Sequence, residues 1–182
     1  MPKKQIYLTG FMGTGKSMIL NCLHEVCGFD KIEMDEQIVQ EQGMSIPEIF
    51  EKKGEEYFRN LETELVKKIS AMDNIVVSCG GGTVMRQCNV DEMKKNGTIV
   101  LLTAEPETVY ERVKGSHNRP LLEKNMNPEY IKELMEARRP KYEAAADFVI
   151  KTDNRTAEEI CLDSVYFENE NYHHRDRKID RI

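Results

Sequence analysis

The segment at residues 10–17 constrains this chain more than any other feature of its sequence. It reads Gly-Phe-Met-Gly-Thr-Gly-Lys-Ser and fits the phosphate-binding pattern G-x-x-x-x-G-K-[ST] at every fixed position. Glycines let successive backbone N–H groups turn towards phosphate oxygens, and the N-terminus of the following helix adds a partial positive charge. In this pattern Lys16 can reach the β- and γ-phosphates of a nucleotide, and the hydroxyl of Ser17 can ligate Mg²⁺.

The residues on either side of this loop support the same interpretation. Residues 5–9 read as a short buried strand, and residues 17–26 read as a helix with regularly spaced apolar residues. A strand, a glycine-rich loop and a helix in that order are the context in which the pattern binds phosphate. The alternative, a merely glycine-rich turn that opens a helix, is disfavoured by this context.

Strand and helix patterns alternate along the rest of the chain. The alternation predicts a three-layer α/β fold, with a mostly parallel five-stranded sheet, right-handed crossovers and helices on both faces. Ligands of such folds bind at the carboxyl ends of the strands. Further strands are expected at residues 31–34, 75–78, 98–103 and 148–150, and further helices at 36–42, 45–53, 55–72, 90–95, 106–113, 128–146 and 156–167.

We expect one domain over residues 1–167, because 182 residues suit a single core and no linker or repeat is visible. Residues 168–182 are almost wholly polar and are predicted to form a C-terminal tail without a packed core. Residues 115–127 have little periodicity and are predicted to form a lid over a bound nucleotide. No run of eighteen apolar residues is present and residues 1–4 lead straight into the first strand, so we expect neither a membrane span nor a signal peptide.

Composition narrows the choice of partners and compartment. The net charge of −6 argues against non-specific nucleic-acid binding through a broad basic face, so anionic ligands would have to bind at local arginine clusters. The 5 cysteines are odd in number and show no C-x-x-C spacing, which favours reduced thiols in the cytoplasm over disulfides or a zinc site. The 4 histidines lack ligand spacing with these cysteines and are interpreted as surface residues.

Two acids and a run of glycines are expected to face the phosphate-binding loop. Asp35 ends the second predicted strand and Glu33 lies two positions earlier, so both carboxylates can point towards one cleft. Residues 80–82 are three glycines after the buried third strand, which suggests that a ligand approaches the backbone closely. Ser78 stands where many phosphate-loop proteins carry a magnesium-binding Asp. Surface positions for the acids and a flexible glycine turn are the alternatives.

Arginines at three places offer partners for a carboxylate or a phosphate. Arg59 lies in the long predicted helix, Arg119 lies in the aperiodic segment, and Arg138 precedes Arg139 and Pro140. Guanidinium groups bind carboxylates and phosphates through paired N–H donors. The alternative is that each is a solvated surface residue, which is the usual position of an arginine.

Taken in order, these motifs strongly resemble the shikimate kinase family. The resemblance extends over nearly the whole chain up to about residue 167, and the combination is far more specific than the loop alone. It implies a fold of the P-loop NTP kinase type and ATP-dependent phosphorylation of the 3-hydroxyl of shikimate, on the pathway to chorismate and the aromatic amino acids. The shared elements are residues 10–17, Asp35, Gly54-Glu55-x-x-Phe58-Arg59-x-x-Glu62, Gly80-Gly81-Gly82, Arg119-Pro120-Leu121 and Arg138-x-Pro140-x-Tyr142.

The resemblance also implies roles for single residues. Asp35 would bind the hydroxyls of shikimate and act as the candidate base, and Arg59 with Arg138 would hold its carboxylate. Arg119 would reach the transferred phosphoryl group and complete a catalytic set with Lys16 and Asp35. The implied substrate loop is Gly80, Gly81 and Gly82. The implied nucleotide site is Gly13, Thr14, Gly15, Lys16, Ser17, Met18, Arg112, Arg119 and Arg155, with Ser17 as the metal ligand.

One position departs from the family pattern. The second strand of the family usually carries Asp-x-Asp, whereas this chain has Glu33-Met34-Asp35. Glu33 falls on the acid that orients Ser17 or a magnesium-bound water, and its side chain is one methylene longer. The family resemblance is unaffected, but the geometry around the metal is left open.

The resemblance implies ATP and Mg²⁺ as cofactors and shikimate as the substrate. We also expect a monomer that binds neither nucleic acid nor membranes. A related small-molecule kinase, such as a gluconate or nucleoside monophosphate kinase, is an alternative, although the paired arginines with Asp35 favour a hydroxylated carboxylate as the acceptor. A non-catalytic module that binds nucleotide or shikimate is the other alternative, and the retained Lys16, Ser17, Asp35 and Arg119 argue against it.

Overall fold

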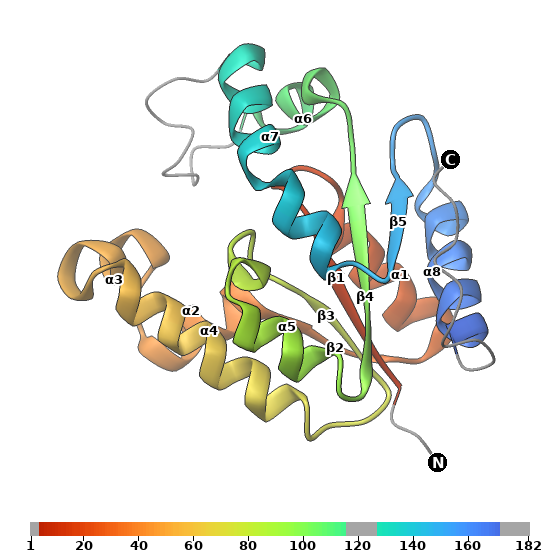
Figure 1. Cartoon of the computed structure of the whole chain (residues 1–182), viewed down its shortest axis with the longest axis horizontal. Helices are drawn as coiled ribbons and strands as arrows, with labels where there is room; N and C mark the ends of the chain where they lie inside the picture. The colour runs from red at the N-terminus through yellow and green to blue at the C-terminus, as the bar shows by residue number, and fades with distance from the viewer. Residues whose placement is uncertain (1–3, 116–126, 172–182) are drawn as a thin grey trace.

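Five parallel strands form one sheet at the centre of the molecule (Figure 1). The computed structural model describes residues 4–115 and 127–171. The strand order is β2-β3-β1-β4-β5, so the expected five-stranded α/β sheet is confirmed and every strand pair is parallel. The strands are β1 (Gln5–Thr9), β2 (Asp30–Glu33), β3 (Ile75–Ser78), β4 (Gly97–Thr103) and β5 (Phe148–Lys151).

Helices connect the strands on both faces of the sheet, as the alternation of patterns predicts. A 3₁₀ turn, η1 (Thr83–Met85), follows the triple glycine. The α-helices within the described residues are α1 (Lys16–Cys27), α2 (Met34–Gln42), α3 (Ile46–Lys53), α4 (Glu55–Ile69), α5 (Gln87–Met93), α6 (Pro106–Val113), α7 (Pro128–Ala145) and α8 (Ala157–Asn171).

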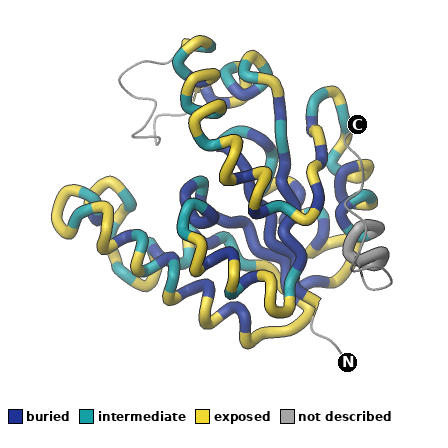
Figure 2. Tube along the Cα trace, viewed as in Figure 1, coloured by how far each residue is buried: buried dark blue, intermediate teal, exposed yellow. Residues whose placement is uncertain are grey.

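The central strand β1 divides the core between the two faces. Its residues are all buried, as expected for a strand with neighbours on both edges and helices above and below (Figure 2). Tyr7 belongs to a cluster that packs against α2, α3, α4, α5 and α7. Ile6 and Leu8 belong to a second cluster that packs against α1 and α8. The period of two along a strand therefore sends alternate side chains of β1 into two cores.

Local signals fix several helix ends. Ser45 caps α3, its hydroxyl accepts from the backbone N–H of Glu48, and the Glu48 carboxylate accepts from the backbone N–H of Ser45. The predicted capping box is therefore present. Gly28 and Gly43 end α1 and α2 with φ of 72° and 64°, a left-handed conformation that glycine adopts without steric cost.

The boundary between β2 and α2 differs from the prediction. The strand ends at Glu33, and the helix already begins at Met34, so Asp35 lies in the first helical turn rather than at the end of an extended strand. Met34, the first helical residue, is fully buried in the larger core cluster. Asp35 and Glu36 are also carboxylates in a first turn, where the helix dipole stabilises negative charge.

The C-terminal helix also extends beyond its predicted end. We expected α8 to stop at residue 167, but it continues to Asn171. Residues 168–171 contain neither Gly nor Pro, so nothing in their sequence interrupts the helical backbone hydrogen bonds. Residues 172–182 of the predicted tail lie outside the described residues. In the described ranges, none of the helices is both long and apolar enough to cross a membrane.

Candidate active site

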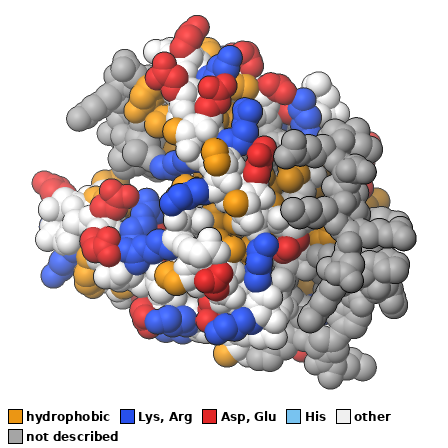
Figure 3. Space-filling model, in the orientation of Figure 1, with side chains coloured by type: hydrophobic (Ala, Val, Ile, Leu, Met, Phe, Trp, Pro, Cys, Tyr) orange, Lys and Arg blue, Asp and Glu red, His pale blue; other side chains and the backbone are white. Residues whose placement is uncertain are grey.

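The predicted site residues come from three neighbouring strands. The phosphate-binding loop follows β1, Asp35 follows β2, and the triple glycine follows β3. These strands are adjacent in the order β2-β3-β1, and all run in the same direction, so their carboxyl ends meet at one edge of the sheet. Figure 3 shows Lys and Arg side chains gathered at a hollow between the part of the molecule with α3 and α4 and the part with α7.

The glycines of the phosphate-binding loop adopt conformations and contacts that other residues would not tolerate. Gly10, Gly13 and Gly15 have φ of 142°, 76° and 100°, all in the region that glycine favours. A Cβ on Gly10 would collide with the carbonyl oxygen of Leu102, and one on Gly13 would lie 2.8 Å from a methyl carbon of Val113. The loop is therefore held close to the backbone of β4 and to α6.

Lys16 and Thr14 are tied to the loop itself. The Lys16 ammonium donates to the carbonyl oxygens of Gly10 and Phe11 at 2.9 and 3.0 Å, so it lies across the loop. The Thr14 hydroxyl donates to the same Phe11 carbonyl at 2.7 Å. Met18, in the first turn of α1, is 46% exposed. The loop thus presents a positive charge and a helix N-terminus to any ligand above it.

Ser17 and Glu33 are joined directly. The Ser17 hydroxyl donates to Glu33 Oε2 at 2.7 Å, which links the start of α1 to the end of β2. Serine and carboxylate oxygens are hard donors of the kind that Mg²⁺ prefers. Among the described residues no group of three or more His, Cys, Asp or Glu side chains could hold a metal ion. These residues fit a Mg²⁺ ion that takes its remaining ligands from phosphates and water, as is usual for this ion.

Gly80 lies against a group of oxygen atoms. A Cβ at this position would lie 2.7 Å from Glu62 Oε1, 2.9 Å from Asp35 Oδ1 and 3.2 Å from Thr83 Oγ1. The carboxylate of Asp35 therefore faces the triple glycine even though its residue belongs to a helix. A side chain at residue 80 would push apart the groups that surround it.

Arg59 is held in place by the buried carboxylate of Glu62. Its Nη1 donates to Glu62 Oε2 at 2.7 Å, and its Nη2 donates to Glu55 Oε1 at 3.1 Å. The Glu62 side chain is 1% exposed, and its other oxygen accepts from the Thr83 hydroxyl at 2.8 Å. Burial by itself lowers the pKa of Arg59, but the carboxylates of Glu62 and Glu55 outweigh it and raise the pKa overall. Arg59 is thus a fixed and permanently charged group.

Arg138 and Tyr142 reach the triple glycine from α7. The Tyr142 hydroxyl donates to the Gly81 carbonyl at 2.5 Å, and Arg138 Nη1 donates to the same oxygen at 3.4 Å. A Cβ on Gly82 would lie 2.6 Å from the guanidinium carbon of Arg59. Burial raises the pKa of Tyr142, and the nearby Arg138 only partly opposes this. Arg59 and Arg138 therefore approach the glycine loop from two different helices.

The arginines predicted to lie near the nucleotide are placed differently from one another. Arg112 Nη1 donates to the Gly13 carbonyl at 3.0 Å and to Thr152 Oγ1 at 3.2 Å, which puts its guanidinium beside the phosphate-binding loop. Arg155 instead forms an ion pair with Asp163 of α8 at 2.7 Å. Arg119 and nearly all of the predicted lid lie outside the described residues.

Three side chains of this site were given no role from the sequence. Glu62 and Tyr142 occur in the shared motifs, and Thr83 directly follows the triple glycine, so proximity in sequence to motif residues is the available signal. Ser78, noted for its position before the glycines, has a buried hydroxyl with no hydrogen-bond partner in the part of the chain that the structure describes. The site contains more positioning groups than the sequence pattern alone suggests.

Comparison with known proteins decides the family. A family model described as shikimate kinase matches residues 12–167. The chain belongs to the shikimate kinase family. It is 44% identical over 158 residues to the shikimate kinase of Thermodesulfovibrio yellowstonii, covering 87% of this chain and 91% of that protein. The shikimate kinase of Acinetobacter baumannii, solved in complex with shikimate, has a TM-score of 0.86 and 30% identity, covering 96% of each chain.

A gluconokinase from Sinorhizobium meliloti shares the fold at lower similarity. Its TM-score is 0.61 and its identity is 17%, covering 96% of this chain and 98% of that one. Identity at this level shows a common fold and says nothing of the acceptor. The resemblance to the shikimate kinase family that the motifs indicate is therefore confirmed.

Proposed function

We propose that this chain transfers the γ-phosphoryl group of ATP to the 3-hydroxyl of shikimate, giving shikimate 3-phosphate and ADP. The supporting observation is that two groups of residues, one for ATP and one for shikimate, lie at the same edge of the sheet in a chain of the shikimate kinase family. One half is the phosphate-binding loop with Lys16. The other is the triple glycine, flanked by Asp35, Arg59 and Arg138. The product would serve the pathway to chorismate and the aromatic amino acids.

The donor half acts by neutralising and positioning the phosphates. Backbone N–H groups of the loop and the N-terminus of α1 would bind the β- and γ-phosphates, and Lys16 would leave its carbonyl partners to join them. Arg112 would border the nucleotide from the side of Gly13. Arg119 would meet the transferred group, a role that rests on the family motif alone.

Ser17, oriented by Glu33, would provide the protein ligand of Mg²⁺. The ion, when bound with ATP, neutralises phosphate charge and polarises the γ-phosphorus. Because Glu33 is the acceptor of the Ser17 hydroxyl, it sets the direction in which the serine oxygen points. We therefore assign Glu33 to positioning rather than to direct contact with phosphate.

The acceptor half selects a hydroxylated carboxylate. Arg59 and Arg138 would bind the carboxylate of shikimate, because guanidinium groups donate pairs of parallel N–H bonds to such anions. The absence of side chains at Gly80, Gly81 and Gly82 lets the ring approach the backbone. This arrangement holds the substrate by the end remote from the phosphoryl group.

Asp35 would orient the 3-hydroxyl and accept its proton. The hydroxyl oxygen forms a bond to the γ-phosphorus, and the bond from that phosphorus to the β,γ-bridging oxygen breaks, releasing ADP. Most of the rate enhancement would come from alignment and charge neutralisation, since phosphoryl transfer needs little covalent assistance from the protein. We also propose that the chain works as a monomer in the cytoplasm. The odd number of cysteines and the lack of C-x-x-C spacing favour this compartment, where thiols stay reduced.

The direct test is a coupled assay of ADP release with the purified chain, ATP and Mg²⁺. We expect turnover with shikimate and none with gluconate or a nucleoside monophosphate. Turnover with gluconate alone would replace the proposed acceptor, and calorimetric binding of shikimate without turnover would indicate a non-catalytic module.

A substitution of Arg59 tests its proposed binding of the shikimate carboxylate separately from general effects on folding. Arg59→Ala should raise the KM for shikimate by about a hundredfold, because a charged hydrogen-bonded partner of the substrate is lost. Arg86→Ala is the matched control, since Arg86 also pairs with a carboxylate of α4, Glu56, at 2.6 Å, but forms no hydrogen bond or ion pair with the described site residues. Equal KM values for the two variants would refute the assignment of Arg59.

A further inference from the structure

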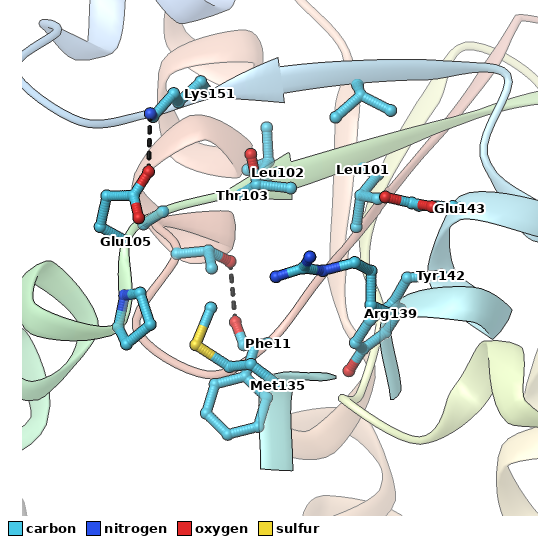
Figure 4. Close-up of a pocket in the computed structure, with 14 residues that line it drawn as sticks. Phe11, Leu101, Leu102, Thr103, Glu105, Met135, Arg139, Tyr142, Glu143 and Lys151 are labelled. Atoms are coloured by element: carbon cyan, nitrogen blue, oxygen red, sulfur yellow. Dashed lines mark hydrogen bonds and ion pairs between the residues drawn. The ribbon is translucent and has the colours of Figure 1, made fainter. Parts of the chain in front are cut away.

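A cavity of about 290 Å³ lies between α7 and the carboxyl-terminal parts of β4 and β5 (Figure 4). This volume is close to the lower end of the range of small-ligand pockets, roughly 300–1,000 Å³. Asp35, Arg59 and Arg138 do not line it, so it is separate from the proposed shikimate site. Its apolar wall is formed mainly by Phe11, Ala104, Pro106, Met135, Tyr142 and Val149.

Two opposite charges on the cavity wall have no partner among the described residues. Arg139 and Glu143 both extend from α7 over the cavity (Figure 4), and neither forms a hydrogen bond or ion pair with any residue in the described ranges. Lys151 and Glu105, which also line the cavity, neutralise each other in an ion pair of 2.7 Å. The cavity therefore offers one unpaired guanidinium and one unpaired carboxylate beside an apolar surface.

We propose that this cavity binds a small zwitterion with an apolar body, of the class of apolar α-amino acids. The carboxylate of such a ligand would pair with Arg139, because a guanidinium donates two parallel hydrogen bonds to a carboxylate. Its ammonium group would pair with Glu143, and its side chain would pack against Phe11, Met135 and Val149. A purely anionic ligand would leave Glu143 unpaired beside it, which disfavours that class.

The cavity shares its walls with the reaction site. Tyr142 lines the cavity, and its hydroxyl donates to the Gly81 carbonyl at 2.5 Å. Phe11 and Thr14 also line it and belong to the phosphate-binding loop. A ligand that shifts any of these residues changes the affinity for shikimate or ATP, and thermodynamic linkage makes that effect reciprocal. The cavity is thus placed to act as an effector site.

Calorimetry with three probes tests the ligand class without depending on the proposed reaction. L-Phenylalanine carries both charges, 3-phenylpropionate lacks the ammonium group, and phenethylamine lacks the carboxylate. We expect L-phenylalanine to bind about tenfold or more tightly than either analogue, since each lost ion pair includes charged hydrogen bonds. Equal binding of 3-phenylpropionate and L-phenylalanine would show a site for carboxylates alone and refute the proposal.

Single substitutions test whether L-phenylalanine binds in this cavity. Arg139→Gln and Glu143→Gln should each weaken L-phenylalanine binding about tenfold or more, whereas Lys132→Gln, an exposed cation elsewhere on α7, should leave it unchanged. Val149→Trp should abolish binding by filling the cavity from an exposed position on β5. Arg59→Ala should still bind L-phenylalanine, which separates this cavity from the shikimate site. Binding that survives Arg139→Gln and Val149→Trp, or no detectable heat with the unaltered chain, would overturn the inference.

Discussion

Glu62 controls the position of Arg59, and replacing it with glutamine tests how much that support contributes. The Glu62→Gln change keeps the size of the side chain but removes its charge. In the unaltered chain one Glu62 oxygen accepts from Arg59 at 2.7 Å and the other accepts from Thr83 at 2.8 Å. A glutamine can accept from only one of them through its single oxygen, and its NH₂ group must then face the other.

The size of the effect follows from the burial of the two partners. The side chains of Glu62 and Arg59 are 1% and 18% exposed, so water replaces little of the lost attraction. Hydrogen bonds to charged groups contribute about 1.5–3 kcal/mol, against about 0.5–1.5 kcal/mol for neutral ones. Weakening two such bonds should lower the free energy of unfolding by about 2 kcal/mol. Glu55 remains as a second partner of Arg59, which keeps the loss below that of a fully broken buried ion pair.

Two measurements on the same variant check this reasoning. Urea unfolding should give the loss of stability, and steady-state kinetics should show a KM for shikimate raised about tenfold, with kcat changed less, because the arginine is displaced rather than removed. Glu55→Gln is the control, since that carboxylate pairs with the same arginine but is 66% exposed and should contribute about 1 kcal/mol at most. If Glu62→Gln were no more harmful than Glu55→Gln in either measurement, the supporting role of Glu62 would be wrong.

Three further predictions concern the metal site, the glycine loop and alkaline stability. Glu33→Ala should remove the acceptor of the 2.7 Å bond from Ser17 and raise the Mg²⁺ concentration for half-maximal activity about tenfold, as a magnesium titration would show. Gly80→Ala should lower kcat/KM about a hundredfold because its Cβ would displace nearby carboxylates, whereas Gly43→Asn, at the end of α2 with no described atom within 4 Å of its Cβ position, should not. Burial raises the pKa of the Cys79 thiol in the folded chain. Above about pH 8.5 the unfolded chain loses this proton while the folded chain keeps it, so the free energy of unfolding falls as pH rises. Urea unfolding between pH 7.5 and 10.5 measures this fall in the free energy of unfolding, and Cys79→Ala should reduce it by about 1.4 kcal/mol per pH unit above pH 8.5. An equal pH dependence in both proteins would contradict a role for the buried Cys79 thiol.

Features set by neighbouring residues could be predicted from the sequence. The phosphate-binding loop depends on glycines at fixed spacings, and the cap of α3 depends on Ser45 and Glu48, which are three residues apart. The order of strands and helices followed from periodicity, and the carboxyl-end rule for parallel sheets then placed the loop, Asp35 and the triple glycine together. Each of these inferences needs only local pattern or a general rule of topology.

Features set by contacts between distant segments could not be predicted in the same way. Asp35 belongs to α2 rather than to a strand, and Met34 beside it packs in a core that is completed by helices later in the chain. The hydrogen bond from Thr83 to Glu62 joins residues of η1 and α4, so the spacing of residues within one element cannot predict it. Arg155 fits a nucleotide-side position by motif, yet it pairs with Asp163 on the next helix.

The register of β2 has a consequence for how errors in folding would show. Glu33 lies opposite Ser78 on β3, which in turn lies opposite Leu8 on β1, so the last residues of β2 and β3 and the penultimate residue of β1 form a row across the sheet. The burial pattern of β2 is weak, since none of its four residues is fully buried. A shift of one residue would turn Glu33 to the opposite face and away from Ser17, and it would also displace Phe29 and Met34, which flank the strand and are buried in the core. A misregistered chain would therefore lose core packing together with its metal-positioning carboxylate, and the active fraction of a refolded preparation would measure how much of it had paired this edge strand correctly.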